Sequence, residues 1–472
     1  MRFTNVKALF VALFLTVISA TISVAGEGQL TPEQQARLKG SERHQQDGWT
    51  IVHIQGDPRI RGFQYGYLMA KEIAESIHAQ RVEWTYRTGL EWSWLLDSSK
   101  QFFSPNVVGE CLEEIDGIVE GMRAAGVATT RNEMIAYNGY IELMWYWWPE
   151  KKKEMESLAP EPRKESCSSF IATGSMTANG GIVLGHNTMS SYISADSYVI
   201  LDVAPSRGHR ILMQTSPGWI HSGTDFFITD AGIVGSETTL GRFKGFDEKG
   251  VPEFVRMRRA TQEASSIDQW CDIMIEGNNG GYANAWLIGD VNTNEIARLE
   301  LGLRYIGFER TKNGYFTGSN IAENVKILRF ETEENETDIR ISGVARRVRW
   351  KELMKQYAGK ITVETAKGFE ADHYDPYLHA LHPGSRTLCA HCDQDSLDAE
   401  LPFEPWGTID AKVVDSRMAK EMSFAARWGS GCGMPFDAGH FLRAHPQFEW
   451  TEGILRSWGS YPWTIVKSVP KR

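Results

Sequence analysis

The sequence has few cysteines, no excess of basic residues and, beyond its first residues, no long hydrophobic run. Its 50 basic and 60 acidic residues give a formal net charge of −10, which argues against nucleic acid or an anionic membrane surface as the main partner. No internal repeat or low-complexity tract occurs. Hydrophobic residues make up 42% and charged residues 23% of the chain, as in an ordinary globular protein.

The one apolar run, from Ala8 to Ile18, follows two basic residues and precedes the small residues Ser23-Val24-Ala25. This pattern predicts a secretory signal peptide over residues 1–25, because the run is too short to span a bilayer. We therefore expect an exported, soluble protein without a transmembrane anchor. It would be periplasmic or extracellular, or lie in a lysosome-like lumen if the source is eukaryotic.

The six cysteines include a single C-x-x-C pair, Cys389-Ala390-His391-Cys392. In an oxidising compartment, Cys389 and Cys392 are predicted to close a small disulfide. Zinc is the alternative interpretation, but a structural zinc site needs about four ligands, and the sequence has no second C-x-x-C. We expect no metal and no organic cofactor.

The chain changes character at about a third of its length. Residues 67–148 have apolar positions at helical spacing, which predicts a helical layer, and a strand is predicted at Trp49 to Gln55. Between Pro149 and Glu165, consecutive lysines, prolines and glutamates predict an exposed loop that is a natural place for cleavage.

Strand-like segments separated by Gly, Asn or Asp turns follow this loop. Helical patterns return at Phe254 to Met274 and at Ala345 to Tyr357. Many antiparallel strands, with helices to pack on both faces, predict an α+β sandwich of stacked sheets. The predicted strands are CSSFIAT, GGIVLGHN, SYVILDVA, HRILMQTS, FFITDAGIVGSETT, YANAWLIGDV, EIARLELG, YIGFER, Trp406 to Val414 and Met422 to Trp428.

Cys167 lies where the loop meets the first of these strands. A thiolate is a strong nucleophile, but a thiol near pH 7 needs a base. If the Ser166–Cys167 bond is cut, the new α-amino group, with a reference pKa of about 7.7–8.0, suits that role. Cys167 itself could make the cut by attacking the Ser166 carbonyl. The alternative is a buried structural cysteine, since free Cys is among the most buried residue types.

Several segments resemble one family. CSSFIATG and GGIVLGHNTM resemble the start of the catalytic chain in phospholipase B-like proteins. Upstream, GDPRIRGFQYG and EEIDGIVEGM resemble the prosegment of related cysteine acyltransferases (the C45 family) that mature penicillin-like amides. Four further segments match the phospholipase B-like proteins in order, namely PGWIHSGTDFFITDAGIVGSETT, GGYANAWLIGD, PWGTIDAKVVD and GCGMPFD.

The resemblance implies an N-terminal nucleophile (Ntn) hydrolase fold, a four-layer αββα sandwich of two stacked, mainly antiparallel sheets. Residues 26–166 would then be an N-terminal segment that packs on the core, and residues 167–472 the catalytic region. The implied chemistry is acyl transfer through a Cys167 thioester, with Ser166–Cys167 as the site of autoproteolysis.

The resemblance also implies roles for other residues. Asn284 is the first candidate for an oxyanion donor, the alternative being an Asn that satisfies the backbone at a strand edge. Thr238 lies on the strand that presents a backbone oxyanion donor in related enzymes, or is an ordinary strand threonine. Arg346 resembles the helix arginine that steadies the nucleophile in bile-salt and penicillin V hydrolases. Arg347, Arg349 or a mere surface role for Arg346 are the alternatives.

His186 and Asn187 are further candidates for binding the oxyanion or substrate. Related amide hydrolases carry Arg at the position of His186 and Asp three residues later, where this chain has Met189. Two registers fit the hairpin. A tight turn at Asn179-Gly180 places Cys167 opposite Tyr192, whereas an open loop from Gly174 to Gly180 places it opposite Asn187. The catalytic interpretation requires the second register.

We therefore predict an exported, self-processing cysteine Ntn hydrolase of phospholipase B-like type. It would cleave acyl esters or amides of phospholipids or other fatty-acyl lipids. One alternative is an amidase or acyltransferase on N-acyl compounds, and another is a non-enzymatic secreted binding protein that keeps the fold. The expected partner is a lipid or N-acyl small molecule, with no nucleic acid. A homo-oligomer is compatible with this expectation.

Overall fold

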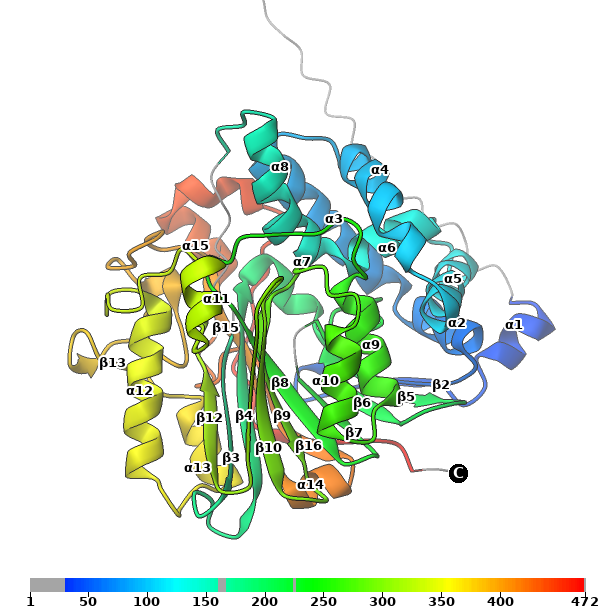
Figure 1. Ribbon diagram of the computed structural model, residues 1–472. Coiled ribbons are helices and arrows are strands. Elements are labelled where there is room, and N and C mark those ends of the chain that lie inside the picture. The colour runs from blue at the N-terminus through cyan, green and yellow to red at the C-terminus, as the bar shows by residue number, and fades with distance from the viewer. Residues whose placement is uncertain (1–29, 160–166, 224–225, 471–472) are drawn as a thin grey trace, which may run out of the picture.

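The computed structural model describes residues 30–159, 167–223 and 226–470 (Figure 1). The predicted signal peptide and Ser166 lie outside the described residues. Within the described ranges, no helix combines the length and apolar character needed to cross a bilayer.

Most strands belong to two sheets. The larger sheet has nine strands in the order β1-β2-β5-β6-β7-β8-β9-β10-β11. All of its neighbours are antiparallel except β2 and β5, which run parallel. Its strands are β1 (Glu42–Gln46), β2 (Trp49–Gly56), β5 (Val199–Pro205), β6 (Ile211–Thr215), β7 (Phe226–Thr229), β8 (Ile233–Thr239), β9 (Asn284–Asp290), β10 (Glu295–Leu301) and β11 (Ile306–Thr311).

The smaller sheet has six antiparallel strands in the order β12-β3-β4-β15-β16-β17. Its two longest strands, β4 and β15, lie side by side at its centre. Its strands are β3 (Ser168–Gly174), β4 (Gly180–Ser191), β12 (Gly314–Gly318), β15 (Trp406–Asp415), β16 (Ser423–Trp428) and β17 (Thr464–Lys467). A separate pair joins β13 (Tyr374–Asp375) to β14 (Ala380–Leu381).

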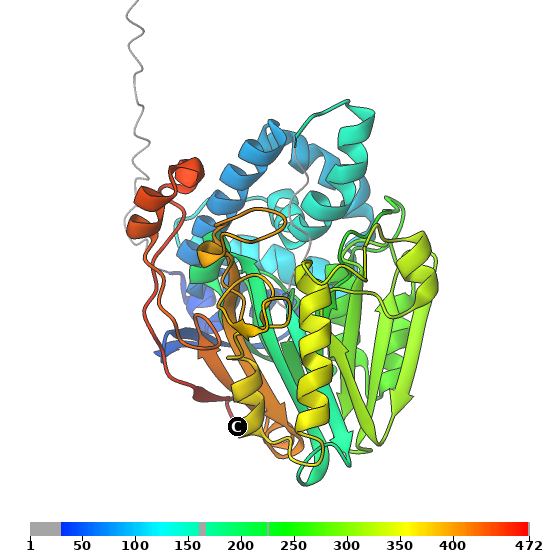
Figure 2. The same cartoon turned by 90° about the vertical axis from the view of Figure 1, so that its left-hand side faces the viewer.

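The two sheets stack face to face, with helices on both outer faces (Figures 1 and 2). Helices α9 (Glu253–Glu263) and α10 (Ile267–Ile275) cover the larger sheet, where Trp270 packs on Phe227 and Trp286. On the smaller sheet, Trp350 of α12 (Ser342–Gln356) and Phe369 of α13 (Val363–Phe369) pack on Phe170. The predicted four-layer αββα sandwich is confirmed.

Buried aliphatic side chains fill the space between the sheets. Ile171, Ile182 and Leu184 of the smaller sheet belong to the same buried cluster as Val234 and Leu287 of the larger one. These positions alternate with residues that face the outer helices, as expected of strands whose two faces are both covered. This alternation decides which side chains near Cys167 point between the sheets.

A layer of helices from the N-terminal third lies across one end of the sandwich (Figure 1). Glycines let helices α2 and α5 cross closely. A Cβ at Gly62 would lie only 2.0 Å from the Glu114 carbonyl oxygen, and one at Gly117 only 2.4 Å from the Arg59 carbonyl oxygen. The layer comprises α2 (Pro58–Leu68), α3 (Ala70–Thr88), α4 (Trp92–Phe102), α5 (Gly109–Ala124), α6 (Arg131–Asn138), α7 (Tyr140–Glu142), the π-helical turn Leu143–Trp147 and α8 (Trp148–Glu154).

Three local features differ from the predictions. The segment predicted as a loop from Pro149 begins as helix α8, since proline is well placed in a first helical turn. The single helix predicted at Phe254 to Met274 is two helices, because Ala264 adopts an extended conformation. Strands β1, β12 and β17 and the short pair β13 and β14 were not predicted. The remaining helices are α1 (Pro32–Arg37), α11 (Val325–Phe330), α14 (Ser416–Lys420) and α15 (Ala438–Ala444).

Candidate active site

The β3–β4 hairpin decides what lies opposite the start of β3. Ser168 pairs with Asn187 and Ser169 with His186, and a bulge shifts the register between Ala172 and Gly174. The tight-turn register that would have placed Cys167 opposite Tyr192 is therefore wrong. The open-loop register is correct to within one residue, and the bulge explains the remaining shift, because it adds a residue to one strand.

Cys167 is held in a strained and buried position. Its exposed fraction is 2% and its φ is +74°, a left-handed conformation that costs a non-glycine residue about 1–2 kcal/mol. The carbonyl oxygen of Cys167 accepts a hydrogen bond of 2.7 Å from Nη1 of Arg346. Such strained residues persist only where their surroundings fix them, and they cluster at active sites.

Arg346 is the one of the three candidate arginines for which a hydrogen bond to Cys167 is seen. Arg346 is fully buried on α12 and also donates from Nη2 to Oδ1 of Asn320, at 2.6 Å. Arg347 pairs instead with Glu323, and Arg349 pairs with Asp372. The guanidinium of Arg346 therefore joins the start of β3 to the segment after β12.

Asn320 extends this connection to the larger sheet. Its Nδ2 donates to the carbonyl oxygen of Thr239, at 2.7 Å, and Thr239 pairs with Asn284 across β8 and β9. A chain of contacts thus leads from Cys167 through Arg346 and Asn320 to the strand ends that carry the two predicted oxyanion residues. Asn320 was not predicted, because no motif in the sequence marks it.

Several buried polar atoms at these strand ends have no hydrogen-bond partner among the described residues. They are Oδ1 and Nδ2 of Asn284 and the hydroxyl oxygens of Thr238 and Thr239. Leaving such a group unsatisfied costs about 1–3 kcal/mol, and most buried polar groups in folded proteins are paired. Asn284 pairs with Thr239, so these two side chains share one face of the sheet, and Thr238 lies on the other face. Buried groups without a partner are suited to a ligand that supplies one.

The first two residues of β3, Ser168 and Ser169, make hydrogen bonds on opposite faces of the strand. The indole Nε1 of Trp350 donates to Oγ of Ser168 at 2.9 Å, on the side of α12. Oγ of Ser169 lies 2.6 Å from Oγ of Ser236, on the side of the larger sheet. The position of the strand after Cys167 is therefore fixed by hydrogen bonds on both faces.

His186 and Asn187 point to opposite faces of β4. His186 is fully buried between the sheets, where its Nε2 lies 3.2 Å from the carbonyl oxygen of Glu237. Burial and the nearby Lys412 lower the pKa of His186 well below its usual value, so its ring is neutral. Nδ2 of Asn187 donates to the carbonyl oxygens of Glu370 and Leu388. Both amide protons of Asn187 are therefore committed to the main chain.

A buried charged network lies beside His186 on β15. Nζ of Lys412 donates to Oε1 of Gln214 at 2.8 Å and to the side chains of Thr188 and Asp410. Burial raises the pKa of Asp410, while Lys412 opposes this effect. Both residues belong to the segment PWGTIDAKVVD, one of the segments that resemble the phospholipase B-like proteins. Asp410 and Lys412 are two residues apart on one strand, so they lie on the same face of the sheet. This spacing of two charged residues in a mostly apolar strand is the signal in the sequence that could have indicated them.

A mostly apolar cavity of about 840 Å³, with several charged residues also in its lining, lies between the helical layer and the end of β4. Tyr198 lines it, and burial raises the pKa of this tyrosine, while hydrogen bonds with Ser194 and Ser190 oppose the effect. The π-helical turn contributes Trp145, whose ring lies 6.1 Å from that of Trp406. The other lining residues include Tyr67, Ala74, Ala79, Val127, Tyr137, Tyr140, Ile141, Ser190, Ile193, Ser194, Trp219 and Ile454.

The predicted disulfide between Cys389 and Cys392 is absent. Sγ of Cys389 lies instead 3.5 Å from Nε2 of His391, and the same nitrogen lies 3.4 Å from Sγ of Cys432. Cys432 lies in the loop after β16, 41 residues beyond His391 in the sequence, yet the fold places its sulfur next to the His391 ring. The sequence prediction was wrong here because it considered only neighbours in the C-x-x-C pair.

Comparisons with known proteins agree with the predicted resemblance. Residues 92–306 match the family model described as Phospholipase B. The chain is 26% identical over 331 residues to the putative phospholipase B-like 2 of Mus musculus, covering 58% of this chain and 56% of that protein. It is 24% identical over 235 residues to the human phospholipase B-like 1, covering 45% of this chain and 41% of that protein.

The chain therefore spans about half the length of the curated relatives it matches. Among solved structures, a mutant conjugated bile acid hydrolase from Clostridium perfringens aligns with 9% identity over 55% of this chain and 89% of that one. The TM-score is 0.34, which is too low to carry an argument about function.

Proposed function

From the match of residues 92–306 to the phospholipase B family, we propose that this chain is a self-processing cysteine hydrolase that cleaves acyl esters, with Cys167 as its nucleophile. The observation that carries the proposal is the fixed position of Cys167. It is a strained residue at the start of a strand, held through its carbonyl by buried Arg346, beside strand ends with unpartnered buried donors. The division into residues 26–166 and a catalytic region 167–472 is part of this proposal.

Self-processing would begin at the bond before Cys167. The sulfur attacks the carbonyl carbon of Ser166, so a C–S bond forms and the C–N bond breaks, with the leaving nitrogen taking up a proton. Water then hydrolyses the thioester, which releases the Ser166 carboxylate and leaves Cys167 with a free thiol and a free α-amine. Strain at Cys167 favours this step, because cleavage frees its φ angle.

Hydrolysis of a substrate would reuse the same sulfur. The α-amine of Cys167 accepts the thiol proton, the sulfur attacks the acyl carbonyl, and the proton passes to the leaving alcohol. Asn284 Nδ2 is the donor that we assign to the developing oxyanion. It is buried and has no other partner within the described ranges, and such a donor is worth about 3 kcal/mol. Water then clears the thioester.

The apolar cavity supports a fatty-acyl substrate. Its volume of about 840 Å³ and its mostly apolar lining suit a hydrocarbon chain, and charged residues that include Lys71, Glu75 and Arg456 also line it. Ser190 and Ser191, at the end of β4, line the cavity and place it at the end of the strand that pairs with β3. An ester of a phospholipid or another fatty-acyl lipid is the substrate class that we propose. Met189, buried where related amide hydrolases have Asp, favours esters over N-acyl amides.

A substrate comparison tests this proposal. The mature protein is expected to release fatty acid from phosphatidylcholine faster than from N-acyl amino acids, and Cys167→Ala should lower the rate at least about 10⁴-fold. Cys271→Ala is the matched control, since it removes another buried thiol, on α10, and should keep wild-type activity. Faster cleavage of the N-acyl amino acids would favour the amidase alternative. No turnover of either class would favour a binding protein.

A further inference from the structure

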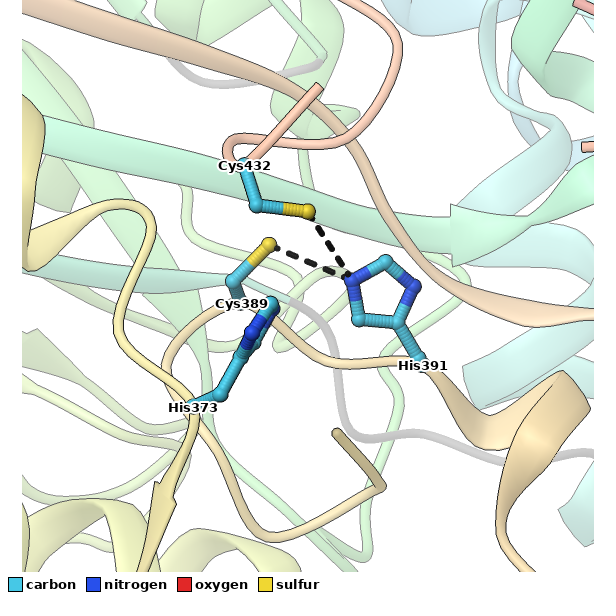
Figure 3. Close-up of side chains that lie close together, drawn as sticks. All are labelled: His373, Cys389, His391 and Cys432. Carbon is cyan, nitrogen blue, oxygen red and sulfur yellow. Dashed lines mark hydrogen bonds between the residues drawn. The ribbon is translucent and has the colours of Figure 1, made fainter. Parts of the chain in front are cut away.

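Four side chains with metal-binding atoms meet in the loops beside the six-stranded sheet (Figure 3). They are His373, Cys389, His391 and Cys432, and each offers one nitrogen or sulfur such that all four atoms lie within 4.8 Å of one another. His373 follows α13, Cys389 and His391 precede β15, and Cys432 follows β16. Three separate segments of the chain therefore converge on one point.

From this convergence, we propose that His373, Cys389, His391 and Cys432 form a structural zinc site. Two sulfurs and two imidazole nitrogens are a ligand set that zinc prefers, in tetrahedral geometry. With Zn–S of about 2.3 Å and Zn–N of about 2.0–2.1 Å, neighbouring ligand atoms lie roughly 3.3–3.8 Å apart. The measured distances from His391 Nε2 to the two sulfurs are 3.5 and 3.4 Å.

The polar atoms of the cluster support a bound cation. Nε2 of His373 is buried and has no hydrogen-bond partner among the described residues. The backbone N–H of Met434 donates to Sγ of Cys432 at 3.4 Å, and Oγ of Ser430 lies 3.3 Å from the same sulfur. Hydrogen bonds of this kind stabilise a thiolate, and ligands held by second contacts are typical of metal sites. Zinc binding would release the protons of both thiols to solvent.

The site is closed rather than catalytic. Four protein ligands complete the coordination of zinc and leave no position for a water or substrate, as in structural sites. Cys389 and His391 are buried. The cluster joins the long loop before β15 to the loop after β16. Leu388, next to Cys389, accepts a hydrogen bond from Asn187, so the proposed zinc would also fix the loop that packs under β4.

No metal was expected from the sequence, because the chain has no second C-x-x-C. Only Cys389 and His391 are close in the sequence, and the other two ligands lie 16 residues before Cys389 and 41 residues after His391. Cys392, the partner of Cys389 in the motif, is not part of the cluster. The zinc proposal therefore uses Cys389 with Cys432, whereas the disulfide that the motif suggested would use Cys389 with Cys392.

Metal analysis of the full-length protein tests the proposal. The protein is purified without chelator and its zinc content is measured by mass spectrometry, with about one zinc per chain expected. Cys432→Ser should reduce zinc content at least tenfold at a matched protein concentration. Cobalt in place of zinc should give the visible absorption of tetrahedral cobalt with thiolate ligands. That spectrum, recorded on the wild type, decides the question even if Cys432→Ser fails to fold.

Three controls make the result specific. Cys392→Ser and Cys271→Ser, which remove buried thiols outside the cluster, should keep one zinc per chain. Cys167→Ala should keep it too, so failure of the proposed hydrolase and failure of the zinc site are distinguishable. A wild-type protein that takes up no zinc or cobalt after reduction overturns the proposal. So does a peptide map in which Cys389 of the natively purified protein is disulfide-linked to Cys392 or Cys432.

Discussion

Two polar clusters of the sandwich use their side chains in opposite ways, one at the ends of β8 and β9 in the nine-stranded sheet and one in the loops beside the six-stranded sheet. At the strand ends that Arg346 and Asn320 link to Cys167, the Asn284 amide and the Thr238 hydroxyl are buried without hydrogen-bond partners within the described part of the chain. Around Cys389, the sulfurs and nitrogens point at one another within 4.8 Å. The first arrangement leaves polar groups that a ligand could satisfy, whereas the second gathers its ligand atoms around one point, as a bound ion requires.

The two clusters are therefore expected to affect different properties, ligand binding for the first and folding stability for the second. Unpartnered donors cost stability in the folded protein, and a ligand or transition state recovers that cost. A closed metal site has the reverse effect, because the free energy of metal binding adds to the free energy of folding. Substitutions at the first cluster should therefore change activity more than stability. Substitutions at the second should change stability more than the chemical step.

The largest of these effects is expected for Asn284→Ala. Loss of one oxyanion donor should lower kcat about 10²–10³-fold. The free energy of unfolding should change by less than about 1 kcal/mol, because the amide makes no hydrogen bond that the substitution breaks. Steady-state kinetics on a lipid ester measure the change in kcat, and denaturant unfolding measures the change in the free energy of unfolding. A variant that unfolds easily but retains kcat would assign Asn284 to the scaffold.

Cys432→Ser should show the opposite pattern. Loss of a zinc ligand is expected to lower the free energy of unfolding by about 3 kcal/mol at saturating zinc, and EDTA should destabilise the wild type to a similar degree. Activity at low temperature, where the variant stays folded, should change less than for Asn284→Ala. Thermal unfolding with and without EDTA measures the effect. Equal stability of both proteins in both conditions would remove the contrast between the clusters.

Thr238→Val should have the smallest effect. Valine keeps the shape of threonine and removes a hydroxyl that has no hydrogen-bond partner in the described part of the structure. Because the resemblance assigns the backbone of Thr238 to the oxyanion, kcat should fall less than about threefold, equivalent to about 0.6 kcal/mol. The unfolding free energy should stay the same or rise slightly. A loss as large as that of Asn284→Ala would show that the hydroxyl itself holds the oxyanion.

Features that depend on neighbouring residues could be predicted from the sequence, whereas contacts between distant segments of the chain could not. Most strands of the two sheets could be predicted because apolar runs and turn residues mark them in order. Cys167 stood out since it lies at a change of composition, and Arg346 stood out by resemblance. Asn320 could not be predicted, because its role comes from the turn after β12, a strand with no strong pattern.

The zinc ligands show the same limit more clearly. The C-x-x-C pair was visible and suggested the wrong partner for Cys389, because sequence spacing cannot tell which thiol the fold brings closest. The β3–β4 register was decided by a bulge between Ala172 and Gly174, which no residue pattern marks. His186 was placed on the correct strand, but its direction into the space between the sheets followed only from that register.

The central claim is that Cys167 becomes an N-terminal nucleophile. Intact-mass analysis of denatured, active wild-type protein, with N-terminal sequencing of each fragment, tests it most directly beside Cys167→Ala. We predict two wild-type polypeptides, one of which begins at Cys167, and a single unbroken chain for the variant. An active wild-type preparation with no break before Cys167, together with undiminished activity of Cys167→Ala, would contradict the claim.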